Sequence, residues 1–221
     1  MENPATTPLE EVRSNIARAC KPARRDPGEI TLIAVSKTHP ATRIIPLIEQ
    51  GQRVFGENRV QEAQAKWPEL LERYPDIELH GIGQLQSNKA EEAVALFNYI
   101  HGLDRPSLLK ALARAVDKSG KRVPCFIQVN IGEEPQKGGC AVADLPDFLA
   151  KVRETAIPIA GLMCIPPFDI EPAPFFALLA KLAADNGLTG LSMGMSGDYE
   201  TAVMLGATHV RVGSALFGER A

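Results

Sequence analysis

The feature that most constrains the fold of this chain is a regular alternation of short apolar segments with longer amphipathic ones. Eight runs rich in β-branched and other apolar residues recur along the chain; they cover residues 30–37, 53–58, 78–85, 99–104, 125–131, 159–165, 191–196 and 209–218. Most runs are apolar on both faces, which is typical of parallel strands buried on both sides. The pattern therefore predicts a parallel sheet with helices packed against it.

The segments between these runs carry signals of helix ends. Pro40 and Gly51 bracket one segment, because proline suits the first turn of a helix and glycine the position just past its end. Pro106 opens another helix, and Asn58 with Gln61 predicts a capping box ahead of residues 60–67. An extra amphipathic helix precedes the first strand, with an apolar face made of Leu9, Val12, Ile16 and Ala19.

The number of units distinguishes between two architectures. Eight strand–helix units in 221 residues leave about 28 residues for each, which is compact but sufficient for a closed barrel. An open doubly wound sheet is the alternative, although eight strands would make it wide. No linker, low-complexity run or charge block divides the chain. We therefore predict an α/β fold with one domain over residues 1–221, a (β/α)₈ TIM barrel with an extra N-terminal helix.

Charge and cysteine content narrow the functional classes. The 24 Lys and Arg against 27 Asp and Glu give a net charge of −3, whereas binding to nucleic acid usually needs a basic excess. No segment approaches the ~20 apolar residues that span a bilayer, and the acidic start lacks the layout of a signal peptide. We expect a cytoplasmic protein with reduced thiols and no metal, because metal-ligand spacing is missing around Cys20, Cys125, Cys140 and Cys164.

Two segments rich in glycine and serine follow the last two predicted strands. Residues 192–198 read SMGMSGD, and residues 211–214 read RVGS. Such segments place small side chains and unpaired backbone N–H groups at helix starts, where the helix dipole favours an anion. In TIM barrels the loops after strands seven and eight often bind phosphate. The sequence therefore predicts a ligand that carries a phosphate group.

Lys37 stands at the end of the first predicted strand. Closure of a barrel makes strand one the neighbour of strand eight, which brings this amine beside the predicted phosphate loops. With partial desolvation and the cationic Arg211 nearby, more of the amine is expected in its neutral, nucleophilic form. These features fit a Schiff base with a phosphorylated aldehyde. A plain phosphate ligand is the alternative role for a lysine at a strand end.

Three other features are weak signals of function. GIGQLQ at residues 81–86 lacks the third glycine of a dinucleotide-binding fingerprint. His101 and His209 are expected to pack or to lie at helix ends, whereas His80 and His39 lie nearer the predicted barrel mouth and keep a functional role open. Trp67 is expected to serve helix packing.

Several motifs resemble the pyridoxal phosphate homeostasis proteins, the YggS/PROSC family. They are AVSKTHP, FGENRVQEA, HGIGQLQSNK, GLMCIPP, LSMGMSGDYETAVMLGATHVR and RVGSALFGER, and they follow one another in the expected order. The resemblance implies a single-domain TIM barrel like the N-terminal half of bacterial alanine racemases. It also implies pyridoxal 5′-phosphate as the cofactor, held as an internal aldimine on Lys37.

The resemblance also implies which residues hold the phosphate group of the cofactor. Ser196 and the backbone from Met193 to Met195 would cradle it. Gly213 and Ser214 would complete that cradle. No metal belongs to the implied site.

Roles around the cofactor ring are implied in the same way. Arg211 would approach the pyridine nitrogen, the phosphate or both, while Asn58 and Ser192 would line the ring pocket. The chain departs from the family pattern at Gly197, where an acidic residue or alanine is common. It also departs at Gly81, where a bulky apolar residue is usual, and this glycine is expected to loosen the third strand.

The implied function is vitamin B6 and amino-acid homeostasis without robust turnover, so no catalytic residue is predicted. Racemisation needs an acid and a base on opposite faces of the ring. Alanine racemases bring one tyrosine from another domain. They also have a second tyrosine four residues after the lysine, where this chain has Ala41. A weak racemase is one alternative and a Schiff-base aldolase the other. We expect a monomer whose partners are pyridoxal phosphate, other phosphorylated B6 vitamers and, transiently, apo-enzymes.

Overall fold

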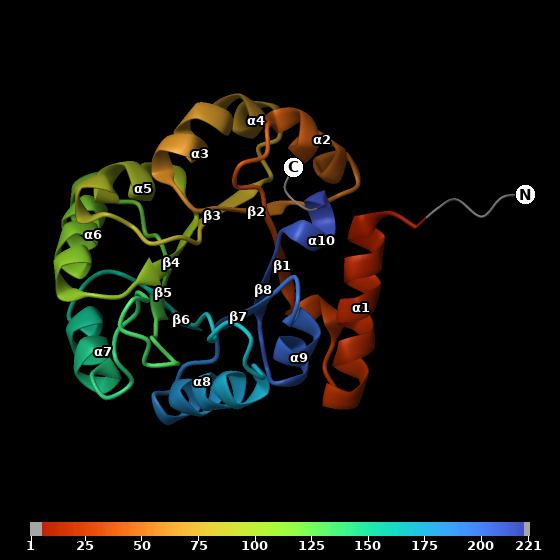
Figure 1. Ribbon diagram of the computed structural model, residues 1–221. Helices are drawn as coiled ribbons and strands as arrows, with labels where there is room; N and C mark the ends of the chain where they lie inside the picture. The colour runs from red at the N-terminus through yellow and green to blue at the C-terminus, as the bar shows by residue number, and fades with distance from the viewer. Residues whose placement is uncertain (1–5, 219–221) are drawn as a thin grey trace, which may run out of the picture.

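A computed structural model describes residues 6–218, in which eight parallel strands close into a barrel. The strands follow one another in chain order, and β8 pairs with β1, so that Ile33 lies opposite Arg211. Figure 1 shows the ring of strands with helices around it. The strands are β1 Thr31–Val35, β2 Val54–Glu57, β3 Glu78–Gly81, β4 Tyr99–Leu103, β5 Cys125–Gln128, β6 Ile159–Met163, β7 Leu191–Met195 and β8 His209–Val212.

Helices follow every strand and cover the outside of the barrel (Figure 1). The predicted (β/α)₈ barrel with an extra N-terminal helix is therefore confirmed. Short 3₁₀ turns lie at Pro27–Glu29 and Ser87–Lys89. The α-helices are α1 Pro8–Ala23, α2 Ala41–Glu49, α3 Val60–Lys66, α4 Pro68–Arg73, α5 Ala90–Leu96, α6 Pro106–Ser119, α7 Leu145–Arg153, α8 Ala173–Asp185, α9 Tyr199–Met204 and α10 Ser214–Phe217.

The core lies between the outer face of the barrel and the helices. Strands are buried on both sides, as their continuous apolar runs predict, and all four residues of β5 are buried. Trp67, at the junction of α3 and α4, is fully buried and packs its ring against Phe55 of β2, with 5.1 Å between ring centroids. This contact confirms the predicted packing role of Trp67.

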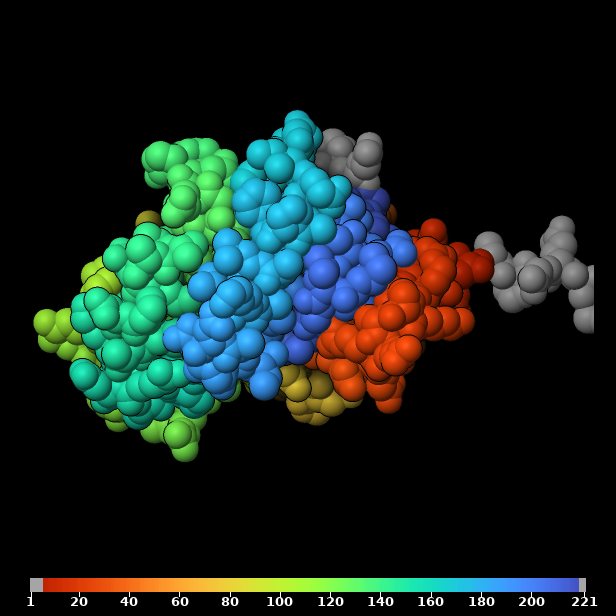
Figure 2. Space-filling view, turned by 90° about the horizontal axis from the view of Figure 1, so that it is seen from below, coloured from red at the N-terminus to blue at the C-terminus, as the bar shows by residue number. Residues whose placement is uncertain are grey.

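The extra helix α1 lies along the outside of the barrel next to α9 (Figure 2). Thr7 and Glu10 form a capping box at its start, which satisfies two backbone N–H groups. Near its other end, Arg25 donates to the carbonyls of Val203 and Ala207 at 3.0 and 2.8 Å. The helix thereby supports α9, which follows the loop after β7.

Some predicted boundaries are wrong. The run 209–218 contains a strand that ends at Val212 and a separate helix α10, because the Gly213 and Ala215 N–H groups turn toward Ser196 Oγ instead of a neighbouring strand. The run that begins at residue 78 ends as a strand at Gly81. The predicted capping box of Asn58 and Gln61 is also wrong, since α3 begins after Arg59 without a side-chain cap.

The four cysteines are buried and form no disulfide. Burial raises the pKa of the thiols of Cys125, Cys140 and Cys164 to about 12, so these thiols are protonated at neutral pH. Within residues 6–218, no cluster of three or more His, Cys, Asp and Glu could hold a metal ion. The helices in the same part of the chain are too short or too polar to cross a bilayer.

Candidate functional site

A cavity of about 590 Å³ opens at the barrel mouth, where the strands end at their carboxyl termini. This size lies within the usual range for small-molecule sites. Of the eight residues individually expected to bind the cofactor, six line it: Lys37, Asn58, Ser196, Arg211, Gly213 and Ser214. Met195, from the expected backbone cradle, and His39 line it as well. The other two of the eight do not line it. Met193 belongs to the hydrophobic core, and Ser192 is fully buried in contact with Arg211.

Lys37 lies in a tight turn directly after β1. The next residue, Thr38, has a φ of +66°, which is rare for a β-branched residue. Its N–H donates to Glu62 Oε1 at 2.5 Å, and the carbonyl of Ser36 accepts from Lys66 Nζ at 2.8 Å. Two side chains of α3 therefore hold the backbone on either side of Lys37, which compensates for the strain of the turn.

A buried ion-pair cluster next to this turn joins β2 to α3. Glu57 is fully buried, and its Oε1 accepts from Ser36 Oγ at 2.7 Å, from Lys66 Nζ at 2.8 Å and from Trp67 Nε1 at 3.0 Å. Lys66 also pairs with Glu62 at 2.9 Å. A carboxylate removed from water needs such partners. Sequence reasoning placed Glu57 only at a strand end and missed Lys66; the one available signal was an acidic residue in an otherwise apolar strand.

The loops after β7 and β8 meet at Ser196. Its Oγ accepts the N–H of Gly213 at 3.1 Å and, more weakly, the N–H of Ala215 at 3.4 Å. The N–H of Met195 donates to Asp198 Oδ1 at 2.6 Å and closes the turn in which Ser196 lies. A hydroxyl and backbone N–H groups thus converge at one part of the cavity wall, an arrangement that suits the oxygen atoms of an anion.

Arg211 extends from β8 into the barrel and reaches the cavity. It is only 4% exposed, and its guanidinium donates to Ser192 Oγ at 2.6 Å and to the Cys164 carbonyl at 2.9 Å. Burial lowers the pKa of Arg211 from its usual value, but an arginine remains protonated in proteins. The cavity therefore has a cation that is held in place. Ser192 contacts this cation but does not line the cavity.

A chain of hydrogen bonds continues from Ser192 into the barrel interior. Ser192 Oγ lies 2.8 Å from His101 Nδ1, and His101 Nε2 lies 3.0 Å from His80 Nδ1. Burial lowers the pKa of His80 and lowers that of His101 much more, so both rings are neutral at pH 7. His80 does not line the mouth, contrary to the sequence-based expectation; its ring packs on Tyr99, with 4.6 Å between centroids. Only closure of the barrel brings these side chains together.

Two further basic side chains line the cavity. The ring of His39 stacks on Phe217 of α10, with 4.5 Å between centroids and 13° between planes. Lys137 pairs with Glu134 at 2.6 Å. Among the described residues, no Asp, Glu or Tyr lines the cavity. Its charge is therefore positive, which favours an anionic ligand.

Comparison with known protein sequences places the chain among well-defined relatives. The profile of the family "Alanine racemase, N-terminal domain" matches residues 8–221. The pyridoxal phosphate homeostasis protein of Escherichia coli K12 is 40% identical over 225 residues, which cover 96% of this chain and 95% of that protein. The protein of the same name from Pseudomonas aeruginosa is 38% identical over 218 residues, covering 96% and 94%.

Solved structures show the same relationship. PipY of Synechococcus elongatus, in a structure with PLP bound, is 41% identical and superposes with a TM-score of 0.82 over 92% of this chain and all of that chain (100%). Alanine racemase from Corynebacterium glutamicum is 18% identical, with a TM-score of 0.65 over 96% of this chain and 61% of that chain. The second likeness shows the fold alone.

Proposed function

The chain belongs to the pyridoxal phosphate homeostasis protein family, and we propose that it binds pyridoxal 5′-phosphate at the barrel mouth, as a Schiff base between the Lys37 amine and the aldehyde carbon. The observation that carries this proposal is that the Lys37 amine after β1, the Ser196 hydroxyl after β7 and the Gly213 N–H after β8 belong to the lining of one cavity. Strands β1 and β8 are paired neighbours in the closed barrel. An amine beside an anion site is what a phosphorylated aldehyde requires.

The residues present fit this cofactor. Pyridoxal phosphate carries a dianionic phosphate, an aromatic ring and an aldehyde, and the cavity offers N–H donors, a buried cation and an amine. Ser196 and the N–H of Gly213 would bind the phosphate oxygens, with Ser214 beside them. When bound, the cofactor supplies an electrophilic carbon and an electron-accepting ring.

Arg211 lies on β8, two residues before Gly213, and is held deeper in the barrel. It is therefore proposed to face the ring nitrogen, and Asn58 to line the ring from the β2 side. Ser192 is proposed as a positioning residue that holds the guanidinium, and Met193 as a core residue that supports the β7 backbone. A cation at this place disfavours protonation of the ring nitrogen, which weakens the electron sink.

This weak electron sink supports a regulator or carrier of vitamin B6 and amino-acid homeostasis over an enzyme. A racemase needs a second acid or base opposite the lysine. Tyr199, the tyrosine of α9, accepts a hydrogen bond from Asn15 on the outside of the barrel. Among the described residues that line the cavity, His39 and Lys137 are the other side chains that could exchange a proton with a substrate, which keeps a weak racemase as the second candidate.

The covalent link is tested by borohydride reduction of the protein loaded with pyridoxal phosphate, followed by peptide mapping. The label is expected on Lys37. The Lys37→Ala variant should lose the visible absorption band and keep its melting temperature, because this side chain lies at the mouth and not in the core. Lys137→Ala is the matched control, since its amine lines the same cavity. A label on Lys137 or Lys89 would overturn the assignment.

The absence of turnover is tested with L- and D-alanine and serine in deuterated water. The loaded protein should exchange their α-protons no faster than pyridoxal phosphate alone, as followed by NMR. If the α-protons exchanged at the ~1 s⁻¹ of ordinary enzymes, and Lys37→Ala abolished this exchange, the carrier function would be rejected in favour of a racemase. Transfer to apo-enzymes, binding of other B6 vitamers, a monomeric state and a cytoplasmic location stay predictions of the same proposal.

A further inference from the structure

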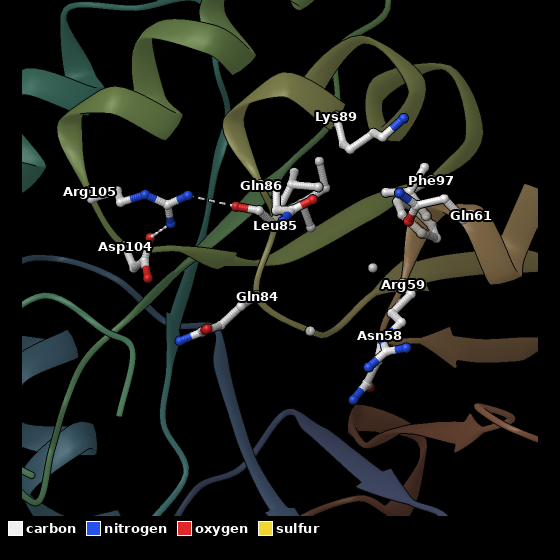
Figure 3. Close-up of a pocket in the computed structure, with 14 residues that line it drawn as sticks. Asn58, Arg59, Gln61, Gln84, Leu85, Gln86, Lys89, Phe97, Asp104 and Arg105 are labelled. Carbon is white, nitrogen blue, oxygen red and sulfur yellow. Dashed lines mark hydrogen bonds and ion pairs between the residues drawn. The ribbon is translucent and has the colours of Figure 1, made fainter. Parts of the chain in front are cut away.

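A second cavity, of about 650 Å³, shares a wall with the first. Asn58, Gly83 and Gln84 line both cavities. The second cavity lies among the segments that follow β2, β3 and β4, and Figure 3 shows the side chains that surround it. Neither Lys37 nor Ser196 lines it. It is therefore a separate space beside the proposed cofactor site.

Close backbone contacts shape the wall of this cavity. A Cβ atom on Gly83 would lie 2.4 Å from the carbonyl oxygen of Asn58, so only glycine fits there. At Gly81 a Cβ would lie 2.8 Å from the ring of Phe97, which occupies the space of the missing side chain. The expected loosening of the third strand at Gly81 is thus offset by Phe97, and the ring becomes part of the cavity lining.

The lining combines an apolar base with amide side chains. Leu85, Phe97 and Ile100 are each less than 10% exposed and line the cavity. Gln61 and Gln86 are exposed, line this cavity and not the first, and their side chains bond to no residue in the described range. An apolar surface with amide groups around it suits a flat ring that carries polar atoms.

The charge of the lining is positive in a chain of net charge −3. Arg105 is neutralised by Asp104 at 2.6 Å. Among the described residues, Lys89 forms an ion pair only with Glu92, a partly exposed carboxylate at 3.0 Å. The exposed side chain of Arg59 makes no hydrogen bond or ion pair within residues 6–218, although its charge contributes to lowering the pKa of Glu62. In Figure 3, Arg59, Lys89 and Phe97 lie on one side of the cavity and the Arg105–Asp104 pair on the other.

We propose that this cavity binds a phosphate monoester of a flat aromatic ring. Arg59 and Lys89 take the phosphate, and the ring lies against Phe97 and its apolar neighbours. Phosphorylated pyridines and nucleoside monophosphates share this chemistry. Because the site uses neither Lys37 nor the loops after β7 and β8, it does not depend on the function proposed above.

The test follows the side-chain amide signals of Gln61 and Gln86 by NMR in the full-length protein. The probes are pyridoxine 5′-phosphate, which has no aldehyde and cannot join a lysine, adenosine monophosphate, and inorganic phosphate. At least one ring-bearing probe should shift both signals to saturation. The ring-bearing probe with the higher affinity shows whether the ligand is a phosphorylated pyridine or a nucleoside monophosphate.

Variants assign the binding to this cavity. Arg59→Ala combined with Lys89→Ala should weaken binding about ten- to a hundredfold, as expected for lost charged contacts. Lys110→Ala combined with Lys118→Ala is the matched control, because both lysines lie on α6 outside the cavity, and it should bind as the unaltered protein does. Lys37→Ala should also keep the shifts, so the two proposals fail separately.

Three outcomes would overturn the proposal. The first is an absence of shifts with every probe. The second is unchanged affinity in the Arg59 and Lys89 double variant, once its melting curve has shown that it is folded. The third is inorganic phosphate binding as tightly as both ring-bearing probes, since the apolar base would then contribute nothing.

Discussion

At the scale of single residues, the turn that carries Lys37 depends on charges that are out of contact with water. One carboxylate oxygen of the fully buried Glu57 accepts three hydrogen bonds, and the ammonium group of Lys66 neutralises the charge of this carboxylate. Lys66 also binds the carbonyl that precedes Lys37. One lysine therefore stabilises a buried charge and positions the proposed cofactor-binding amine.

Lys66→Met is expected to lower the free energy of unfolding by roughly 3 kcal/mol, because the carboxylate of Glu57 stays buried without its countercharge. Urea unfolding measures this loss. Lys118→Ala, which removes an exposed ion pair with Glu91, should cost less than about 1 kcal/mol. Combining Lys66→Met with Glu57→Gln should restore much of the loss. Equal effects of Lys66→Met and Lys118→Ala would contradict the buried-charge argument.

At the scale of elements, α1 is an addition to the barrel that supports α9 and the segment after it. Asn15 of α1 and Arg25, two residues after the end of α1, both bond to α9 or to the segment after it. The loop before α9 contains Ser196, so α1 stabilises the proposed phosphate site from outside without lining it. Helices in proteins owe most of their stability to such packing.

Thr7→Ala should lower the free energy of unfolding by about 1 kcal/mol, because it removes the hydroxyl of the capping box at the start of α1. Thr7→Ser keeps a capping hydroxyl and should retain most of the stability. Thermal and urea unfolding measure both variants. Affinity for pyridoxal phosphate should not change in either variant, and a loss of affinity would show that α1 acts directly on the site.

At the scale of the whole molecule, barrel closure assembles a polar interior. His80, His101 and His209 come from three strands, and their rings lie within 6.2 Å of one another between centroids. Burial, followed by the charges of His80 and Arg211, lowers the pKa of His209 to about 4. These histidines are thus neutral in the folded barrel at pH 7.

This interior predicts a stability that falls as the pH decreases below 6.5. The unfolded chain takes up a proton at His209 near its ordinary pKa, whereas the folded chain does so only near 4. Unfolding is therefore favoured by up to about 1.4 kcal/mol per pH unit for this group. The free energy of unfolding, measured with urea between pH 6.5 and 5, should fall less steeply with decreasing pH for His209→Asn than for the unaltered protein. Parallel curves would contradict the prediction.

Local pattern was sufficient for much of the fold. The strands could be predicted because burial on both faces requires a continuous apolar run, as in residues 125–128. Proline and glycine marked helix ends because their backbones prefer those positions, as at Pro106 and Gly120. Lys37, Ser196 and Gly213 could be predicted to lie at one mouth, where all three line the same cavity, because the carboxyl ends of strands in a barrel meet there.

Other features depend on contacts between distant segments. The sequence by itself determined the order and type of the elements, since periodicity and turn chemistry act over a few residues. Only the tertiary structure decided that Ser192 supports Arg211, that His101 and His80 form one chain, that Lys66 neutralises Glu57, and that Phe97 fills the space beside Gly81. The physical reason is that hydrogen bonds and packing depend on distance in space. Closure of the barrel sets those distances for residues far apart in the chain, such as the 91 positions between His101 and Ser192 and the 178 between Ile33 and Arg211.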